Sequence, residues 1–428
     1  MIDIKLIRSN PKLVIQNLRK REDKEKVKWV EEIKLLDEKW RHNLQRMEKL
    51  RHKRNQVTQE IAKLKKEKKS VSKLIKEVKE IPDKIKKLEE RNSKYREKID
   101  YYMLRIPNML HESVPVGKDD AGNKTVRTWG DPPKFDFNSR NHFDILRGLR
   151  LIDQERANKI SGHGFFFLAR DLVLLDQALQ RYAIDKLTEK GYMLINPPYM
   201  MRRKPYEGVI QLGDFEDVIY KIENEDLYLI ATGEHPMAAL FMNEVLEKRD
   251  LPLKFIAVSP CFRKEVGAHG KYTRGLFRMH QFNKVEQFIF CLPEESWNLH
   301  EEMQKHAEEL YQSLGLSYKV KNVCTGDIGD IAAKKYDIDI WMADGEYREV
   351  GSNSNCTDYQ ARRLNIKYRE QEGKAPVDYV HTLNNTAIAT SRTMVALLER
   401  YQQKDGSVEI PKVLQSYMGG IKKLGIKK

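Results

Sequence analysis

The sequence predicts an α+β protein, with an N-terminal antiparallel coiled-coil hairpin followed by a domain built on an antiparallel β-sheet flanked by helices. Two observations lead to this fold class. Apolar residues recur at steps of three and four from about residue 28 to residue 106, and short apolar runs then alternate with helical patterns. The 428 residues are enough for more than one domain core. We place a helical hairpin domain at residues 1–110 and a larger domain at residues 111–428.

Two runs of similar length share the apolar spacing that predicts the hairpin. The first run has Val30, Ile33, Leu36, Trp40, Leu44, Met47, Leu50, Val57, Ile61 and Leu64, and the second has Val71, Leu74, Val78, Ile81, Ile85, Leu88, Tyr95, Ile99, Tyr102 and Ile106. A sustained three-four alternation is typical of a narrow coiled-coil seam. Lys65–Ser70 between the runs is too polar to bury, so the helices should fold back on each other over about 50 Å. Pro82 should kink the second helix or start it locally.

Most of the excess positive charge lies in the hairpin. The chain has a formal net charge of +15, and residues 26–106 hold 26 of the 78 Lys and Arg residues but only 14 of the 63 Asp and Glu residues. A basic surplus of this kind favours a polyanionic partner, usually a nucleic acid. A solvated helix face is the plainer alternative explanation.

In the larger domain, helical patterns cover residues 171–190 and the regions near 235–247, 294–314 and 391–402. The strand-like runs are LYLIAT, KFIAVSPCFR, KVEQFIFCL, DIDIWM and YREVGS. Several short strands among helices favour an antiparallel sheet.

The cysteines and the hydropathy exclude several classes of protein. Cys261, Cys291, Cys324 and Cys356 are about thirty residues apart, with no Cys-x-x-Cys pair, so we expect neither a disulfide framework nor a zinc site. Reduced thiols fit a cytoplasmic protein. The N-terminus lacks the apolar core of a signal peptide, and no run approaches the roughly eighteen apolar residues of a membrane span.

Four stretches place unpaired polar residues beside strand-like runs: Ala231–Glu234, Phe262–Phe288, Arg348–Asn355, and Leu383–Thr386 followed by Arg392. In the second stretch, arginines suit phosphates, a glutamate suits an exocyclic amine and a phenylalanine suits a base. Each residue alone has a plainer explanation, such as a surface ion pair, a core phenylalanine or a strand-edge charge. Their joint order and spacing favour a nucleotide site.

These stretches resemble the class II aminoacyl-tRNA synthetases, and within them the seryl-tRNA synthetases. YMLINPPYM resembles motif 1, FRKE…HQF resembles motif 2, and TAIATSRTMVALLE resembles motif 3. The Thr-x-Glu pair, SNCTDYQARR, IPNMLHESVPVG and the basic hairpin resemble features of the seryl branch, with an archaeal and eukaryotic leaning. The resemblance extends from Met1 to about Met418, in the family's order.

The resemblance implies a serine–tRNA ligase. Such an enzyme activates L-serine with ATP and Mg²⁺ to seryl-adenylate, and then transfers the seryl group to the 3′ end of tRNA(Ser), or of tRNA(Sec) where the organism has one. It also implies a cytoplasmic homodimer formed through the motif 1 region, with no zinc and no membrane association. The basic hairpin would reach the tRNA held on the partner's active site and grip its phosphates.

The resemblance also carries ATP-binding roles onto this chain. The implied residues are Arg263, Lys264, Glu265, Arg278, Met279, Phe282, Glu349, Val350, Gly351, Ser352 and Arg392. Arg263 would bridge the carboxylate and the α-phosphate, Arg278 would neutralise the leaving phosphates, and Arg392 would cover the adenine, which makes these three the catalytic residues. Glu349 and Ser352 would hold Mg²⁺. Positioning and fixed charge would perform the catalysis without a side-chain nucleophile or general base.

Serine recognition requires groups that pair with the substrate hydroxyl, since alanine lacks only that group. The implied serine-binding residues are Thr232, Gly233, Glu234, Arg263, Glu286, Asn384 and Thr386. Glu286 and Thr386 resemble the hydroxyl readers. Asn353 stands where the family usually has Cys, and we expect it beside the pocket, with an effect on serine affinity. The loop 267–275 would meet the arriving tRNA end.

Three alternatives remain open from the sequence. A truncated-type paralogue that loads a carrier protein would lack the basic hairpin. A non-catalytic RNA-binding paralogue would lack Arg263, Glu286 or Arg392, which are all present. A class II synthetase for threonine or proline would lack this N-terminal hairpin.

Overall fold

A computed structural model describes residues 1–210, 217–265 and 275–425. The chain divides into two compact units, Met1–Pro107 and Asn108–Lys428. Among the described residues, no helix is both long enough and apolar enough to cross a bilayer.

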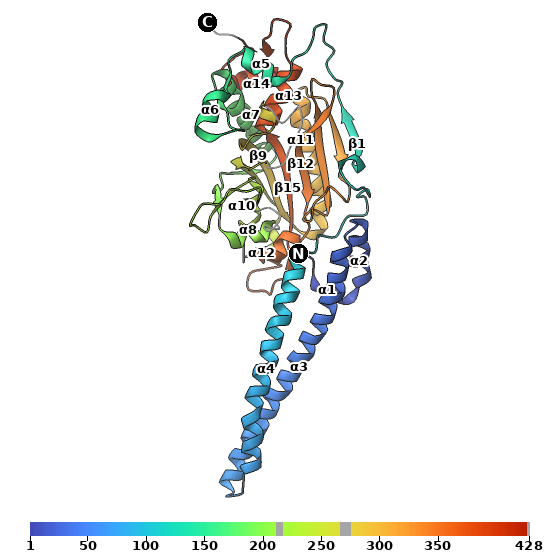
Figure 1. Cartoon of the computed structure of the whole chain (residues 1–428), viewed down its shortest axis with the longest axis vertical. Coiled ribbons are helices and arrows are strands. Elements are labelled where there is room, and N and C mark those ends of the chain that lie inside the picture. Colours follow the sequence, from blue (N-terminus) through green and yellow to red (C-terminus); the bar gives the residue numbers. More distant parts are fainter. Residues whose placement is uncertain (211–216, 266–274, 426–428) are drawn as a thin grey trace. The chain divides into compact units, whose positions relative to one another are not determined.

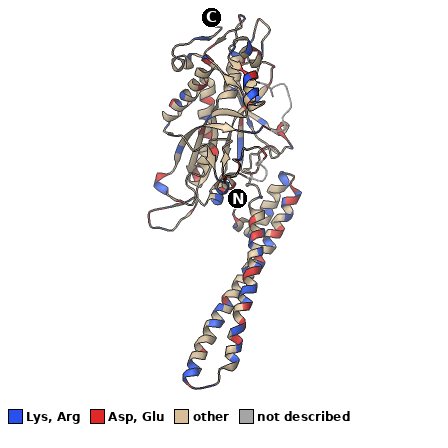
Figure 2. Ribbon diagram, turned by 60° about the vertical axis from the view of Figure 1, so that its left-hand side comes forward, with Lys and Arg blue, Asp and Glu red and all other residues tan. Residues whose placement is uncertain are grey.

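The first unit is helical, as predicted. Its elements are α1 (Ile4–Ser9), α2 (Pro11–Lys20), α3 (Lys24–Lys66) and α4 (Ser72–Met103). Asp3, Asn10 and Asp23 cap the first three helices by accepting hydrogen bonds from backbone N–H groups of the first turn. Figure 1 shows α3 and α4 as the long antiparallel hairpin. Basic and acidic residues are interspersed along both of these helices (Figure 2).

The seam of the hairpin combines apolar contacts with one buried pair of amides. Met47 packs against Ile81, Ile85 and Leu88. Elsewhere in the seam, Nδ2 of Asn43 donates to Oδ1 of Asn92 at 2.9 Å, and Nδ2 of Asn92 donates to the carbonyl of Trp40 at 3.1 Å. Both asparagines are buried. Such a pair is satisfied in one register only, and it therefore selects how the two helices align.

Of the two effects expected of Pro82, a local helix start is wrong, because α4 runs through it without a break, and a kink stays a prediction. Pro82 lies on the exposed side of the helix. Water can therefore serve the carbonyl that loses its intrahelical donor, which makes a proline tolerable there.

The second unit is built on one large sheet, which confirms the predicted fold class. Within the described residues, eight strands have the order β1-β10-β11-β12-β15-β9-β8-β4. Their bounds are β1 Lys124–Trp129, β4 Met193–Ile195, β8 Leu253–Phe262, β9 Gln281–Cys291, β10 Tyr318–Asn322, β11 Lys334–Trp341, β12 Tyr347–Asn355 and β15 His381–Ala389. All neighbouring strands are antiparallel except β4 and β8.

Helices cover both faces of this sheet, and alternation along β9 shows which side chains face each layer. Val285 and Ile289 enter the core shared with α7 (Asp171–Thr188), α11 (Ser296–Ser313) and α13 (Thr390–Arg400). Phe288 and Phe290 enter a second core with α8 (Arg203–Val209), α10 (Glu234–Ala238) and α12 (Tyr359–Leu364). The polar residues of the candidate site share the face of this second core.

The predicted helix near 235–247 is shorter than expected. It ends at Ala238, and the chain then turns into β7 (Val245–Glu247), which pairs in parallel with β13 (Lys367–Arg369). Asn243 takes a positive φ of 66°, which a continuous helix does not allow.

The remaining elements are short. They are α5 (His142–Gly148), α6 (Gln154–Ser161), α14 (Lys412–Gln415), β2 (Ile152–Asp153), β3 (Phe167–Leu168), β5 (Met200–Met201), β6 (Tyr228–Leu229), β14 (Asp378–Tyr379), β16 (Val408–Glu409), β17 (Lys423–Leu424), and the 3-10 turns Asp120–Gly122, Lys248–Asp250, Gly275–Phe277, Pro293–Glu295 and Ser416–Met418.

Candidate active site

A cavity of about 790 Å³ opens on the sheet face that carries the polar residues. Several of the residues singled out in the sequence line it together: Thr232, Glu234, Arg263, Glu265, Arg278, Ser352 and Asn384. Its wall also contains Lys335, Ser354, Cys356 and the segment 328–332, which sequence reasoning did not single out. A cavity of this size that joins apolar and charged groups suits a small charged ligand.

Arg263 follows directly after strand β8 and is held from two sides. Its backbone N–H donates to the carbonyl of His280 at 2.9 Å, which joins the two ends of the predicted motif 2. Its Nε donates to the carbonyl of Ala231 at 3.1 Å, and its guanidinium lies 5.2 Å from the ring centroid of Phe282. The backbone and the ring thus orient a guanidinium at the cavity wall.

Arg278 and Glu265 form an ion pair across this wall, with 3.2 Å between Nη1 and Oε2. Between Arg263 and Glu265, Lys264 contributes its backbone N–H to the carbonyl of Val218 at 2.9 Å. The loop predicted to meet a tRNA end, 267–275, lies outside the described residues except for Gly275.

Behind the cavity, three buried polar residues from adjacent strands meet. Thr386 on β15 lies opposite Glu286 on β9, and its hydroxyl donates to Oε2 of Glu286 at 3.2 Å. Nζ of Lys284 lies 2.7 Å from the same oxygen, with side-chain exposures of only 7% for Lys284 and 2% for Glu286. Lys284 was missed at the sequence level, although its i, i+2 spacing to Glu286 places both on one face of a strand.

Glu234 brings a second carboxylate into this region. Its backbone N–H donates to Oγ1 of Thr232 at 3.2 Å, and its Oε1 accepts from Nε2 of Gln360 at 3.1 Å. The pKa of Glu234 is raised to about 7, chiefly by burial and in second place by the charge of Glu286. Lys284, Gln360 and Arg263 oppose that rise.

Gly233, directly before α10, allows the chain to approach β8 closely. A Cβ atom on Gly233 would lie 3.1 Å from Oγ of Ser259 and 3.2 Å from Cβ of Ala257, tighter than ordinary contact. Gly233 is thus placed by packing beside the cavity rather than within its lining.

The expectation that Asn353 lies beside the pocket is wrong. Strand alternation turns Ser352 and Ser354 toward the cavity and Asn353 toward α11. There its Nδ2 donates to the carbonyl of His300 at 2.9 Å and to Oε1 of Gln304 at 3.2 Å. An amide below the sheet has no direct contact with a ligand in the cavity.

The residues of β12 predicted to bind the nucleotide, and Arg392 beside them, also differ in where they lie. Nη1 of Arg392 donates to the carbonyl of Glu349 at 2.7 Å, and its guanidinium lies 4.9 Å from the ring centroid of Phe277. The side chain of Val350 is buried in the core on the other face, so only its backbone can serve a nucleotide. Gly351 packs against Thr386, where a Cβ would lie 3.0 Å from the Cβ of Thr386.

The same strand pair offers hard oxygen donors for a cation. Asp337 on β11 lies opposite Ser352, and burial raises its pKa well above the usual range, with a further rise caused by the charge of Glu349. An Asp337 carboxylate whose ionisation is disfavoured beside Glu349 suits a divalent cation, and Ser352 adds a hydroxyl oxygen. Among the described residues, no group of three or more His, Cys, Asp or Glu side chains is arranged to hold a metal by itself.

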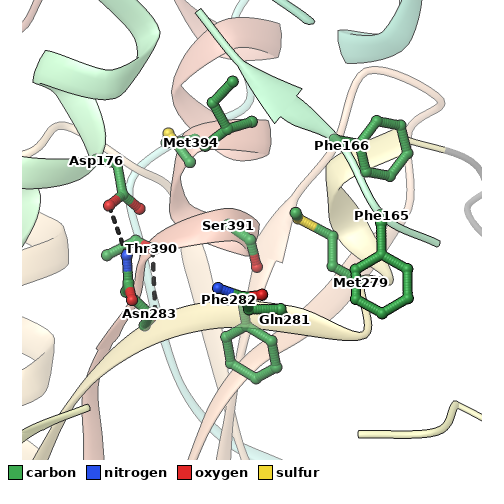
Figure 3. A pocket seen from close by; sticks show the side chains of 11 residues that line it. Phe165, Phe166, Asp176, Met279, Gln281, Phe282, Asn283, Thr390, Ser391 and Met394 are labelled. Carbon is green, nitrogen blue, oxygen red and sulfur yellow. Dashed lines mark hydrogen bonds between the residues drawn. The ribbon is translucent and has the colours of Figure 1, made fainter. Parts of the chain in front are cut away.

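Phe282 and Met279 line a second, smaller cavity of about 180 Å³. Figure 3 shows Phe165, Phe166 and Met279 on one side of it, and Asn283 on the other, where Asn283 bonds to Asp176 and Thr390. The aromatic side chains offer flat apolar surfaces for a planar ring. Phe165 and Phe166 were not singled out in the sequence.

Comparisons with known proteins agree with this geometry. Residues 218–401 match the family model described as the tRNA synthetase class II core domain (G, H, P, S and T), and residues 1–110 match the seryl-tRNA synthetase N-terminal domain. The serine–tRNA ligase of Methanocorpusculum labreanum is 52% identical over 425 residues, covering 99% of this chain and 100% of the relative.

Two solved structures are similar over the whole chain. The seryl-tRNA synthetase from Pyrococcus horikoshii complexed with ATP is 50% identical, with a TM-score of 0.96 and complete coverage of both chains. The cytoplasmic serine–tRNA ligase from Naegleria fowleri in complex with AMP is 36% identical, with a TM-score of 0.91, covering 100% of this chain and 99% of that chain. The match over residues 1–110 argues against the carrier-loading and sibling alternatives. This chain therefore belongs to the seryl-tRNA synthetases, the serine–tRNA ligases of class II.

Proposed function

We propose that the cavity behind Arg263 is where this chain joins L-serine to ATP, and that the chain then transfers the seryl group to the 3′ end of tRNA(Ser). The observation that carries the proposal is the pairing of two unlike walls. One wall holds Arg263 and Arg278, and beyond the other lies the buried set formed by Lys284, Glu286 and Thr386. The first suits phosphates and a carboxylate, and the second suits a hydroxyl.

Arg263 and Arg278 would perform the first step by fixed positive charge. The serine carboxylate and the α-phosphate of ATP are both anions, so their approach is unfavourable until a cation lies between them. Arg263 is already oriented by Ala231 and Phe282 for this bridging role. Arg278 would leave Glu265 and neutralise the outgoing phosphates. The carboxylate itself is the nucleophile, so no side-chain base is required.

The adenine would lie on Phe282 and beneath Arg392, with Glu265 accepting from the exocyclic amine and Met279 lining the edge. Arg392 contacts Phe277 and Glu349 in the present structure, so this role needs its guanidinium to change partners. Lys264, Val350 and Gly351 would contribute through their backbone. The ATP bound to the Pyrococcus horikoshii relative supports ATP as the nucleotide.

Glu349 and Ser352 would hold Mg²⁺, with Asp337 close behind them. The ion would neutralise phosphate charge and orient the nucleotide. The mutual repulsion between Asp337 and Glu349 supports this assignment, because a bound cation would relieve it.

Serine would be read at three points. Glu286 and Thr386 would pair with its hydroxyl, so that alanine would leave them without a partner. Thr232 and Glu234 would hold the ammonium group. Asn384, whose Nδ2 lies 3.6 Å from Sγ of Cys356, would shape the remaining wall.

The helical hairpin would bind tRNA(Ser), or tRNA(Sec) where present, through its exposed Lys and Arg side chains, mainly by phosphate contacts. We further propose a cytoplasmic homodimer through the motif 1 region. Support comes from the exposed apolar residues on and near the edge strand β4, which include Met193 (61% exposed), Leu194 (48%) and Met200 (44%). An apolar edge of this kind normally marks an interface.

Amino-acid-dependent exchange of pyrophosphate into ATP tests the proposal. Purified protein should exchange with L-serine and not with L-threonine or L-alanine. Equal exchange with either of the latter would refute the specificity assigned to Glu286 and Thr386.

A further inference from the structure

Gln360 is a fully buried amide next to the cavity, and the proposed activation of serine gives this residue no role. It lies in α12, its exposure is 0%, and it does not line the cavity. A buried amide needs a donor for its oxygen and an acceptor for its NH₂ group. Gln360 finds these partners on two different elements, Thr382 on β15 and Glu234 on α10.

The hydrogen bonds through Gln360 run in one direction. The hydroxyl of Thr382 donates to Oε1 of Gln360 at 2.7 Å, and Nε2 of Gln360 donates to Oε1 of Glu234 at 3.1 Å. An ionised carboxylate can only accept, so the NH₂ group must face Glu234. The oxygen of the amide then faces Thr382, whose hydroxyl supplies the donor that it needs.

These hydrogen bonds supply a donor to only one of the two carboxylate oxygens of Glu234. In the described part of the chain, Oε2 of Glu234 accepts no hydrogen bond and Glu234 makes no ion pair, although it lines the cavity. Glu286 differs, because Lys284 and Thr386 already contact its Oε2. Of the two carboxylates, Glu234 is thus the one that is oriented but still lacks a cation.

We propose that Gln360, oriented by Thr382, is a positioning residue that holds Glu234 for the α-ammonium group of L-serine and thereby sets the affinity for serine. The inference rests on the proposed role of Glu234 in binding that ammonium. A neutral donor suits the task. A Lys or Arg at this position would neutralise Glu234, and an acidic residue would add a third negative charge beside Glu234 and Glu286.

Gln360→Leu tests the proposal in the full-length protein by serine-dependent pyrophosphate exchange. Hydrogen bonds to charged groups contribute enough to change an equilibrium about 10- to 100-fold. The KM for serine should therefore rise about 10- to 100-fold, while the KM for ATP stays within about twofold. A rise of both KM values together, with a lowered melting temperature, would indicate general damage to the fold and overturn the proposal.

A matched pair of variants tests the other end of the chain of bonds. Thr382→Val removes the hydroxyl and keeps the shape, and it should raise the KM for serine about 3- to 10-fold. Thr382→Ser keeps the hydroxyl and should restore a KM close to that of the natural protein. Equal KM values for the two variants would overturn the proposal that Thr382 orients Gln360. If Gln360→Leu does not fold, this pair of variants still tests the proposal.

A double-mutant cycle separates this inference from the role of Glu234 itself. If Gln360 acts through Glu234, the double variant Glu234→Gln/Gln360→Leu should bind serine no more weakly than Glu234→Gln alone. If the two substitutions raise the KM for serine independently, so that their fold-changes multiply, Gln360 does not act through Glu234. If Glu234→Gln leaves the KM for serine unchanged, the ammonium assignment fails as well. If it raises that KM while Gln360→Leu does not, only the role of Gln360 fails.

Discussion

Charged residues are used in opposite ways in the hairpin and in the cavity. In the hairpin most of them lie in water, as in the Arg51–Glu89 pair, where both side chains are 51% exposed. Behind the cavity a pair is buried, namely Lys284–Glu286, where the exposures are 7% and 2%. Water and salt screen the first kind of pair, so each contributes little alone. The second kind is hardly screened, and each partner depends on the others.

The difference implies two kinds of recognition. A field of exposed charges can follow the phosphates of a large ligand and tolerates the loss of any one of them. A buried set recognises a small ligand by leaving partners unsatisfied when one group is missing. Substitutions should therefore have graded effects in the hairpin and severe effects at the cavity.

The largest effect should come from Arg263→Ala. Removal of a preorganised charge that stabilises the reacting groups lowers rates by about 10²- to 10³-fold or more. Serine-dependent pyrophosphate exchange should fall at least that far while the melting temperature changes little. Arg263→Lys is the control, because it keeps the charge and loses the planar fork, and it should remain strongly impaired. Near-normal exchange in Arg263→Ala would refute its role.

Deletion of residues 30–104 should have the next largest effect, and only on tRNA charging. The second unit has its own cores, so a short Gly-Ser bridge across the deletion should preserve exchange. Loss of several phosphate contacts should weaken tRNA binding by roughly 10²-fold or more at moderate salt. The test is to measure tRNA charging and serine-dependent pyrophosphate exchange on the same preparation of the deletion variant. Unimpaired charging would show that the tRNA binds elsewhere.

Serine affinity should depend on pH through Glu234, whose pKa is raised to about 7. An ammonium ion binds the ionised carboxylate, so the KM for serine should fall by up to about tenfold per pH unit as the pH rises toward 7, and then level off. Glu286, Lys284 and Arg263 face the same carboxylate, whereas buried His235, with a pKa lowered to about 3, stays neutral throughout. Glu234→Gln should flatten the profile, and an unchanged slope would contradict the assignment.

The smallest effect should come from one exposed hairpin cation. Lys86→Ala should raise the KM for tRNA by less than about threefold and reduce the slope of log KM against log salt by roughly one unit or less. Glu90→Ala on the same helix is the matched control and should not weaken binding. A tenfold loss from one lysine would mean that the hairpin recognises a specific site rather than a charged surface.

Periodic patterns explain why so much of the fold could be predicted. The three-four spacing located α3 and α4, and the apolar runs located β8, β9, β11 and β12. Local exceptions depended on three-dimensional surroundings. Pro82 is tolerated because it faces water. The helix that begins at Glu234 ends early, and residues 245–247 pair with β13 as a strand instead.

The candidate site was predictable where residues follow a recognisable motif, and less so where their roles depend on strand faces. Lys284 and Glu286 share a face, which spacing alone could have shown. The prediction placed Asn353 at the pocket together with its neighbours Ser352 and Ser354. Strand alternation turns its side chain to the other face of the sheet. Gln360 could not be found from sequence, since its partners, Glu234 and Thr382, are separated from it by 126 and 22 residues.

The buried Asn43–Asn92 pair has a consequence for how far the hairpin extends. Sliding α4 along α3 by one heptad would preserve most apolar contacts and displace the tip by about 10 Å, roughly the rise of seven residues. The amide pair disfavours such a slip, because the slip would bury both side chains without partners. The pair therefore helps to determine the distance between the base of the hairpin and the turn at Lys65–Lys69, and with it the reach of the exposed Lys and Arg side chains.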